Sequence, residues 1–187
     1  MRIEPFDTKR LRIREIEPGD AEPMHAYCSD ERFCLFLTWG PNTREDTEAY
    51  VQRAIQHQSD DPRCEYEVAF TLRETGEVIG HGHIYLSKKH PEAEVEGFFA
   101  RAYWGQGFGK EAIRGLCSIA FDSLGLHRVY ATVDPSDVAS ARLLEGAGMQ
   151  RDGHLREHAW AKGEWRDSLL YSLLVWEHAM LQPEKQA

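Results

Sequence analysis

The stretch WGQGFGKEAIRGLCSIAFDSL, residues 104–124, decides the fold of this chain. Its first six residues hold glycine at alternate positions. The residues that follow place apolar side chains three and four apart: Ala112, Ile113, Leu116, Cys117, Ala120, Phe121 and Leu124. This spacing predicts an amphipathic helix that begins beside a glycine-rich turn. Because a helix start presents free backbone N–H groups and the positive end of the helix dipole, the turn is suited to hold a phosphate.

The turn differs from the two common nucleotide-binding motifs. A Walker loop needs Ser or Thr after its lysine, whereas Glu111 follows Lys110. A Rossmann loop reads G-x-G-x-x-G in an early strand-helix-strand unit, whereas this turn reads G-x-G-x-G and follows several predicted strands. Both motifs are therefore excluded, and the alternatives are another kind of phosphate cradle or a glycine-rich turn with no ligand.

Extended and helical patterns alternate on both sides of this stretch. Asp20 is placed to cap a short helix, Thr43 and Asp46 resemble a capping box for a helix that ends near His57, and Asp134 followed by Pro135 reads as the start of a later helix. The helix that follows Pro135 is predicted over residues 136–147. The predicted strands are residues 9–17, 66–72, 78–86, 94–100, 128–133, 149–161 and 166–175.

This order predicts one mixed α/β domain over residues 1–187. Its sheet is expected to be mostly antiparallel, with about seven strands flanked by about four helices and one strand-helix-strand unit near the centre. The length and the 42% of apolar residues are sufficient for one sizeable core.

Charge and composition exclude several classes of function. The net charge of -9 and the lack of a long basic run make nucleic acid an unexpected partner. No apolar stretch is long enough for a secretory signal or a membrane span, so we expect a cytoplasmic protein. Its four cysteines are irregularly spaced without a CxxC pair, which predicts reduced thiols.

Five fragments, in order along almost the whole chain, resemble the GNAT superfamily and especially its ribosomal-protein N-terminal acetyltransferase branch. They are TKRLRIRE, ETGEVIGHGHI, AYWGQGFGKEAI, HRVYATVDPSDVASARLLEGAGM and HLREHAWAKGEWRDSLLYSLL. Gly107 and Gly109 match the two small positions of the GNAT signature, and Trp104 stands where Gln or Arg is usual, as is typical of that branch. The resemblance implies the GNAT fold and transfer of an acetyl group from acetyl-CoA to a primary amine.

The resemblance also implies which residues hold the cofactor. The pyrophosphate of acetyl-CoA would lie on the backbone of Gly105, Gln106, Gly107, Phe108, Gly109 and Lys110. The pantetheine arm would pair with the preceding strand at Phe98, Phe99 and Ala100, if that strand separates from its neighbour. Asp137 stands where the branch usually has an asparagine that holds the pantetheine arm, but an ionised aspartate cannot donate a hydrogen bond. The alternative is that the negative charge of Asp137 stabilises the positive end of a helix.

The family's usual tyrosine acid is missing, because Leu144 stands at that position. Ser140 lies one helical turn earlier, and the resembling branch also has serine at this position. Its hydroxyl is therefore a candidate to protonate the departing thiolate. The alternative is that the hydroxyl only hydrogen-bonds a carbonyl of its own helix.

Glu94 and Glu96 share one face of a strand beside the expected thioester and are candidate general bases. His83 and His158 are further options, and water-relayed deprotonation needs no dedicated base.

The segment between the first two helices is unusually apolar. Phe33 and Trp39, with His158, are candidate walls of the acceptor site, although the aromatic residues could equally cover the sheet. No metal is expected, because the nine histidines include no HExxH-like motif.

Three functions remain open. The first is acetylation of a protein N-terminal α-amine. The second is acetylation of a small amine such as an aminoglycoside, a polyamine or an amino-acid derivative, and the third is a non-catalytic CoA-binding module. The oligomeric state is expected to be a monomer or a homodimer.

Overall fold

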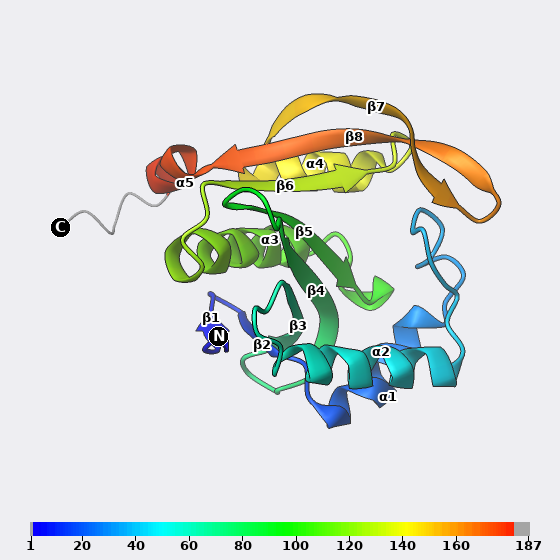
Figure 1. Cartoon of the computed structure of the whole chain (residues 1–187). Coiled ribbons are helices and arrows are strands. Elements are labelled where there is room, and N and C mark those ends of the chain that lie inside the picture. The colour runs from blue at the N-terminus through cyan, green and yellow to red at the C-terminus, as the bar shows by residue number, and fades with distance from the viewer. Residues whose placement is uncertain (1, 182–187) are drawn as a thin grey trace.

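The structure is a computed structural model that describes residues 2–181, and its centre is one eight-stranded sheet (Figure 1). The strand order is β1-β2-β3-β4-β5-β6-β8-β7, and all neighbours are antiparallel except β5 and β6. The strands are β1 Phe6–Asp7, β2 Leu11–Glu15, β3 Glu65–Leu72, β4 Val78–Leu86, β5 Glu92–Phe99, β6 Arg128–Val133, β7 Gln150–Ala161 and β8 Glu164–Leu174. The α-helices are α1 Ala21–Cys28, α2 Arg44–His57, α3 Phe108–Ser118, α4 Val138–Ala147 and α5 Val175–Leu181.

The predicted mixed architecture with a mostly antiparallel sheet is therefore confirmed. Within residues 2–181 there are eight strands and five α-helices, where about seven and about four were expected. The additions are the two-residue edge strand β1 and the terminal helix α5, both too short to leave a periodic pattern. No helix of the described range is both long and apolar enough to cross a membrane.

Two hydrophobic clusters cover opposite faces of the sheet. Helices α3 and α4 supply the larger cluster, in which Phe70 of β3 is fully buried and stacks on Phe99 of β5 with ring centroids 4.9 Å apart. Helices α1 and α2 supply the smaller one, which includes Met24, Val51 and Ala69. The sheet is therefore buried on both sides where β3 and β4 run, so polar side chains there need partners, whereas one face of β5 stays partly exposed.

Strands β5 and β6 separate soon after they pair. Their parallel register joins Glu92 to Arg128 and Glu94 to Tyr130 at its two ends, and no pair follows it. From Val95 to Phe99 the β6-side edge of β5 has no strand partner, while β6 goes on to pair with β8 as far as Val133. Figure 1 shows the ends of β5 and β6 diverging. This wedge leaves backbone N–H and C=O groups available to a ligand.

One predicted helix cap is wrong. Helix α4 is capped by Asp137, whose Oδ1 accepts a hydrogen bond from the backbone N–H of Ser140 at 3.0 Å, and Asp134 instead closes a turn by accepting from Ser136 N–H at 2.8 Å. Asp20 is the N-cap residue of α1, as predicted, but its carboxylate makes no capping hydrogen bond and pairs with Arg14 at 2.7 Å instead. The Thr43 and Asp46 capping box of α2 is confirmed.

The four cysteines are free thiols. Burial raises the pKa of Cys28 and of Cys117 to about 12, so neither thiol is nucleophilic at neutral pH.

His81 of β4 titrates differently in the folded and the unfolded chain. Its Nδ1 lies 3.0 Å from the Tyr27 hydroxyl, and burial, with His83 beside it, holds its pKa well below the ordinary value of 6.5. As the pH falls, His81 therefore binds a proton in the unfolded chain but not in the folded chain. We expect the free energy of unfolding to fall below about pH 6.5, by up to about 1.4 kcal/mol per pH unit.

His81→Asn keeps an acceptor for Tyr27 and removes the titration, so it should flatten this dependence in urea melts between pH 7.5 and pH 5. The exposed His90 is the matched control, because His90→Asn should leave the dependence intact. An unchanged slope in His81→Asn would contradict the assignment.

Candidate active site

The glycine-rich turn forms the start of α3, as its sequence predicts. Gly105 and Gly107 have φ values of +72° and +82°, in the left-handed region that side chains disfavour, and Gly107 is the N-cap of α3. Gln106 and Lys110 are exposed, while Phe108 is buried in the core below the turn. The helix start therefore exposes the backbone of Gly105 and Gly107 beside the side chains of Gln106 and Lys110.

Arg10 fastens this turn to the N-terminal strands. Its Nη1 donates to the carbonyl of Gln106 at 2.9 Å, and its guanidinium carbon lies 4.0 Å from the centroid of the Phe108 ring. Glu111 holds Arg10 in place by accepting from its Nε at 2.7 Å and from its backbone N–H at 2.6 Å. Sequence reasoning missed this tether, because its partners lie about a hundred positions apart and no local motif joins them.

The edge of β5 lies next to this turn. Phe98 and Phe99 end the strand, and Ala100 begins the short 3-10 turn that leads on. The indole N–H of Trp104 donates to the carbonyl of Phe99 at 2.6 Å, which fixes the strand end against the turn. The structure thus brings the residues expected to hold the pyrophosphate and the pantetheine arm onto one continuous backbone path.

Ser140 and Asp137 lie together at the first turn of α4. The Ser140 hydroxyl donates to Asp137 Oδ2 at 2.7 Å, while Asp137 Oδ1 caps the helix. Asp137 therefore orients the Ser140 hydroxyl, a role that the sequence did not indicate.

Glu94 and Glu96 occupy the same face of β5, and each meets a different neighbour. The Thr132 hydroxyl of β6 donates to Glu94 Oε1 at 2.9 Å, and Glu96 Oε2 lies 3.5 Å from His83 Nδ1. Burial raises the pKa of Glu94, although the hydrogen bond from Thr132 opposes the shift. Glu94 is thus engaged at the wedge, whereas the Glu96 side chain keeps 38% of its surface exposed.

A row of polar residues extends from the partly exposed Glu96 into the buried part of the sheet. Glu96 lies opposite His83, and His83 lies opposite Glu67 of β3. The hydroxyl of Tyr50 on α2 is hydrogen-bonded to His83 Nε2, and that of Tyr85 to His83 Nδ1. The sequence indicated this row only through polar residues at alternate positions, at 65 and 67, 81 and 83, and 94 and 96, inside otherwise buried strands.

The residues expected to wall the acceptor site lie on this side of the sheet. Phe33 is buried, with Trp39 against it at 5.9 Å between ring centroids, and Trp39 meets Phe98 at 5.5 Å. His158 lies exposed on β7, with Nδ1 3.1 Å from the Ser168 hydroxyl. Trp39 thus connects the apolar segment to the end of β5, whereas Phe33 lies behind it.

A cavity of about 390 Å³ opens beside the wedge. Three segments build it: the connection between α1 and α2, the turn after β6, and the start of β8. Lys162, at the tip of the β7–β8 hairpin, donates to the carbonyl of Cys34 at 2.5 Å and ties the hairpin to that connection. The lining residues are Leu35, Phe36, Asp134, Pro135, Ser136, Glu164, Arg166 and Asp167.

Comparisons with known proteins agree with this geometry. The family described as Acetyltransferase (GNAT) domain matches residues 10–150. The N-acetyltransferase p20 of Bacillus licheniformis is 32% identical over 178 residues, which cover 95% of this chain and 99% of p20.

Two solved structures share the fold. A GNAT-family acetyltransferase from Bacillus anthracis superposes with a TM-score of 0.82 at 26% identity, covering 92% of this chain and 99% of its own. A spermidine N-acetyltransferase from Vibrio cholerae, solved with CoA and spermine, has a TM-score of 0.79 at 21% identity, covering 92% and 99%. Together with the wedge and the glycine turn, these matches establish that the chain belongs to the GNAT family of acetyl-CoA-dependent N-acetyltransferases.

Proposed function

We propose that this N-acetyltransferase acts on the α-amino group of a protein or peptide. The observation that carries the proposal is the cavity beside the wedge. It is open to solvent and combines apolar Leu35 and Phe36 with backbone and charged groups, so it suits the first residues of a chain end. Its one guanidinium, that of Arg166, lies 2.9 Å from Glu164 and 3.9 Å from Asp134, and Asp167 lies 2.6 Å from His154, so the carboxylates of the lining outnumber its one arginine. This surplus of negative charge would also hold a cationic amine, which is why the acceptor panel must include spermidine.

Acetyl-CoA would bind along the backbone path described above. Residues 105–110 would hold its pyrophosphate through N–H groups at the start of α3, and the free β6-side edge of β5 between Val95 and Phe99 would pair with the pantetheine amides. Two of the backbone groups expected at Phe98, Phe99 and Ala100 are already bonded, since the Ala100 N–H donates to the Ile79 carbonyl at 2.9 Å and the Phe99 carbonyl accepts from Trp104. Because the proposed contacts are mostly with the main chain, we expect substitution of a glycine at this turn to weaken acetyl-CoA binding more than loss of any single side chain.

The chemistry then needs two proton transfers. The neutral amine nitrogen attacks the thioester carbonyl carbon, the new C–N bond forms, and Glu96 takes the proton that the nitrogen gives up. The C–S bond breaks, and the leaving thiolate takes a proton from water or from Ser140, which water then reprotonates while Glu96 releases its proton to solvent. Donation by Ser140 requires its hydroxyl to rotate away from Asp137. An α-amine, with a pKa near 7.7 to 8.0, needs less help from a base than a lysine near 10.4.

An acceptor panel tests the proposal. We expect acetylation of a lysine-free peptide with a free N-terminus, at a kcat/KM at least about tenfold above that of spermidine or an aminoglycoside. Phe36→Ala should raise KM for the peptide, whereas Trp176→Ala, an exposed aromatic on α5, should not.

Transfer to spermidine or an aminoglycoside without transfer to any peptide would overturn the acceptor class. Acetyl-CoA binding with no transfer to any acceptor would instead favour a non-catalytic module.

A further inference from the structure

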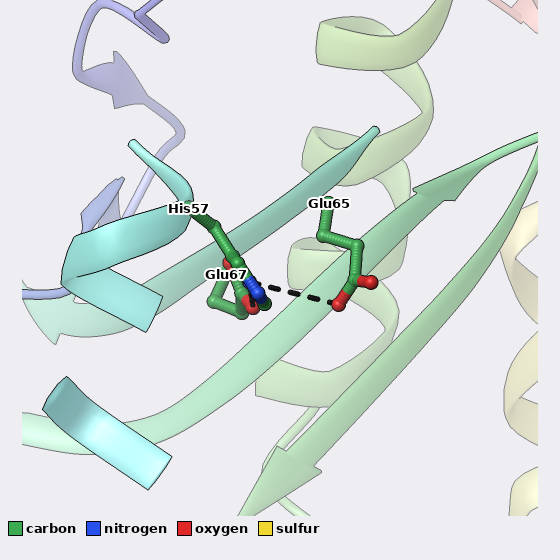
Figure 2. Close-up of side chains that lie close together, drawn as sticks. All are labelled: His57, Glu65 and Glu67. Atoms are coloured by element: carbon green, nitrogen blue, oxygen red, sulfur yellow. Dashed lines mark hydrogen bonds and ion pairs between the residues drawn. The ribbon is translucent and has the colours of Figure 1, made fainter. Parts of the chain in front are cut away.

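Three potential metal ligands converge where α2 ends against β3, away from the wedge. His57 is the last residue of α2, and Glu65 and Glu67 occupy alternate positions on β3, so both carboxylates are on the face that α2 covers. His57 Nδ1 lies 2.6 Å from Glu67 Oε1 and 3.6 Å from Glu65 Oε2, and one ligand atom from each residue falls within 4.8 Å of the others. Figure 2 shows both carboxylates directed toward the imidazole ring.

Glu67 is incompletely satisfied in this position. Its side chain is only 2% exposed, and its Oε2 is buried without a hydrogen-bond partner. A buried carboxylate oxygen that has lost its water and gained no partner is costly, which is why buried charges usually pair or coordinate a metal. The imidazole contributes at most one positive charge against two carboxylates, so the cluster stays negative in either state of His57.

We propose that His57, Glu65 and Glu67 bind one divalent cation, with Zn²⁺ the best match. One imidazole nitrogen and two carboxylate oxygens are a ligand set that Zn²⁺ accepts, and three protein ligands leave a position for water. Two ligands of a tetrahedral zinc lie about 3.3 Å apart for bonds of about 2.0 Å. The 3.6 Å separation already fits, and the 2.6 Å hydrogen bond opens by about 0.7 Å when the metal replaces the proton between the two groups. Glu65, 46% exposed, provides the entry route.

A cation bound here would stabilise α2, the helix that contacts the polar row next to the proposed acceptor site. Tyr50 lies seven residues before His57, so the two share a helix face, and Tyr50 is hydrogen-bonded to His83, which contacts Glu96. Binding at the end of α2 therefore fixes the helix that holds this row. None of the site's three ligands lines the wedge or the cavity, so the cation would act by fixing α2 and not in the acetyl transfer itself.

The test is calorimetric titration of ZnCl2 into the full chain after chelator treatment, with Co²⁺ absorption as a spectroscopic readout. We expect one cation per chain and a raised melting temperature. Glu67→Gln and His57→Asn should each weaken binding at least about tenfold and abolish the tetrahedral Co²⁺ spectrum. Glu65→Gln, at a more exposed ligand, keeps the test valid if a buried substitution prevents folding.

Two control variants address the other groups that attract zinc. His154→Asn removes an exposed histidine that pairs with Asp167, and Cys64→Ser removes the partly exposed thiol next to Glu65. Both should bind the cation as the wild type does. The proposal is overturned if the wild type binds no stoichiometric cation, or if binding survives in the ligand variants but is lost in a control.

Discussion

Glu96→Gln is expected to lower kcat for peptide acetylation by about 10²- to 10⁴-fold, the usual contribution of a positioned general base. The carboxylate lies on the open edge of β5, 3.5 Å from His83 Nδ1, in the position from which we propose it takes the proton of the amine. The amide of Gln has nearly the same shape but cannot accept a proton, so the KM for acetyl-CoA should change little. Steady-state kinetics with both substrates varied separates the two parameters.

The pH dependence gives a second readout of the same role. With an α-amine acceptor, kcat/KM of the wild type should rise until the acceptor is neutral, near pH 8, and then level off. Glu96→Gln should show a rate that keeps rising with hydroxide.

Glu92→Gln is the matched control for Glu96→Gln. Glu92 is on the same face of β5 but is bonded to Arg128 at 3.0 Å in the part that pairs with β6, so this variant should keep its kcat. A kcat of Glu96→Gln within threefold of the wild type would assign deprotonation to water or to another group.

The parts of the fold that local pattern determines were predictable. The spacing of apolar residues after the glycine turn gave α3, although its last turn widens into a π-helix over Ile119–Ser123. Alternation and turn residues gave the β3–β4–β5 meander. The segment Asp-Pro-Ser-Asp misled the prediction because both aspartates carry a capping signal, and the choice depends on which carboxylate reaches Ser140 N–H.

The site was predictable only where one local stretch builds it. The glycine turn does so, whereas the wedge depends on where the pairing of β5 and β6 stops, which no propensity encodes. The row from Glu96 through His83 to Glu67 depends on the register of three strands, and a shift of one residue would turn these side chains to the other face. The Arg10 tether joins segments that only the folded chain brings together.

Gly107→Val is expected to raise the Kd for acetyl-CoA by about 5- to 150-fold, equivalent to about 1–3 kcal/mol of backbone strain. Gly107 has φ +82°, where a β-branched residue is a severe outlier. The space around it is not the obstacle, since an added Cβ would lie 3.5 Å from Arg10 Nη2, an ordinary contact. Relief of the strain must therefore move the backbone, and with it the N–H groups that we propose hold the pyrophosphate. Calorimetric titration of acetyl-CoA measures the effect.

Gly125→Val separates this loss from simple destabilisation. Gly125 has φ +66° in the turn beyond the other end of the same helical run, and nothing lies within 4 Å of an added Cβ. Both variants should lose similar stability in urea melts, but only Gly107→Val should lose acetyl-CoA affinity. If both retained wild-type affinity, the backbone of the glycine turn would not be what holds the pyrophosphate. If both lost it equally, the effect would follow from stability and not from the geometry of residues 105–110.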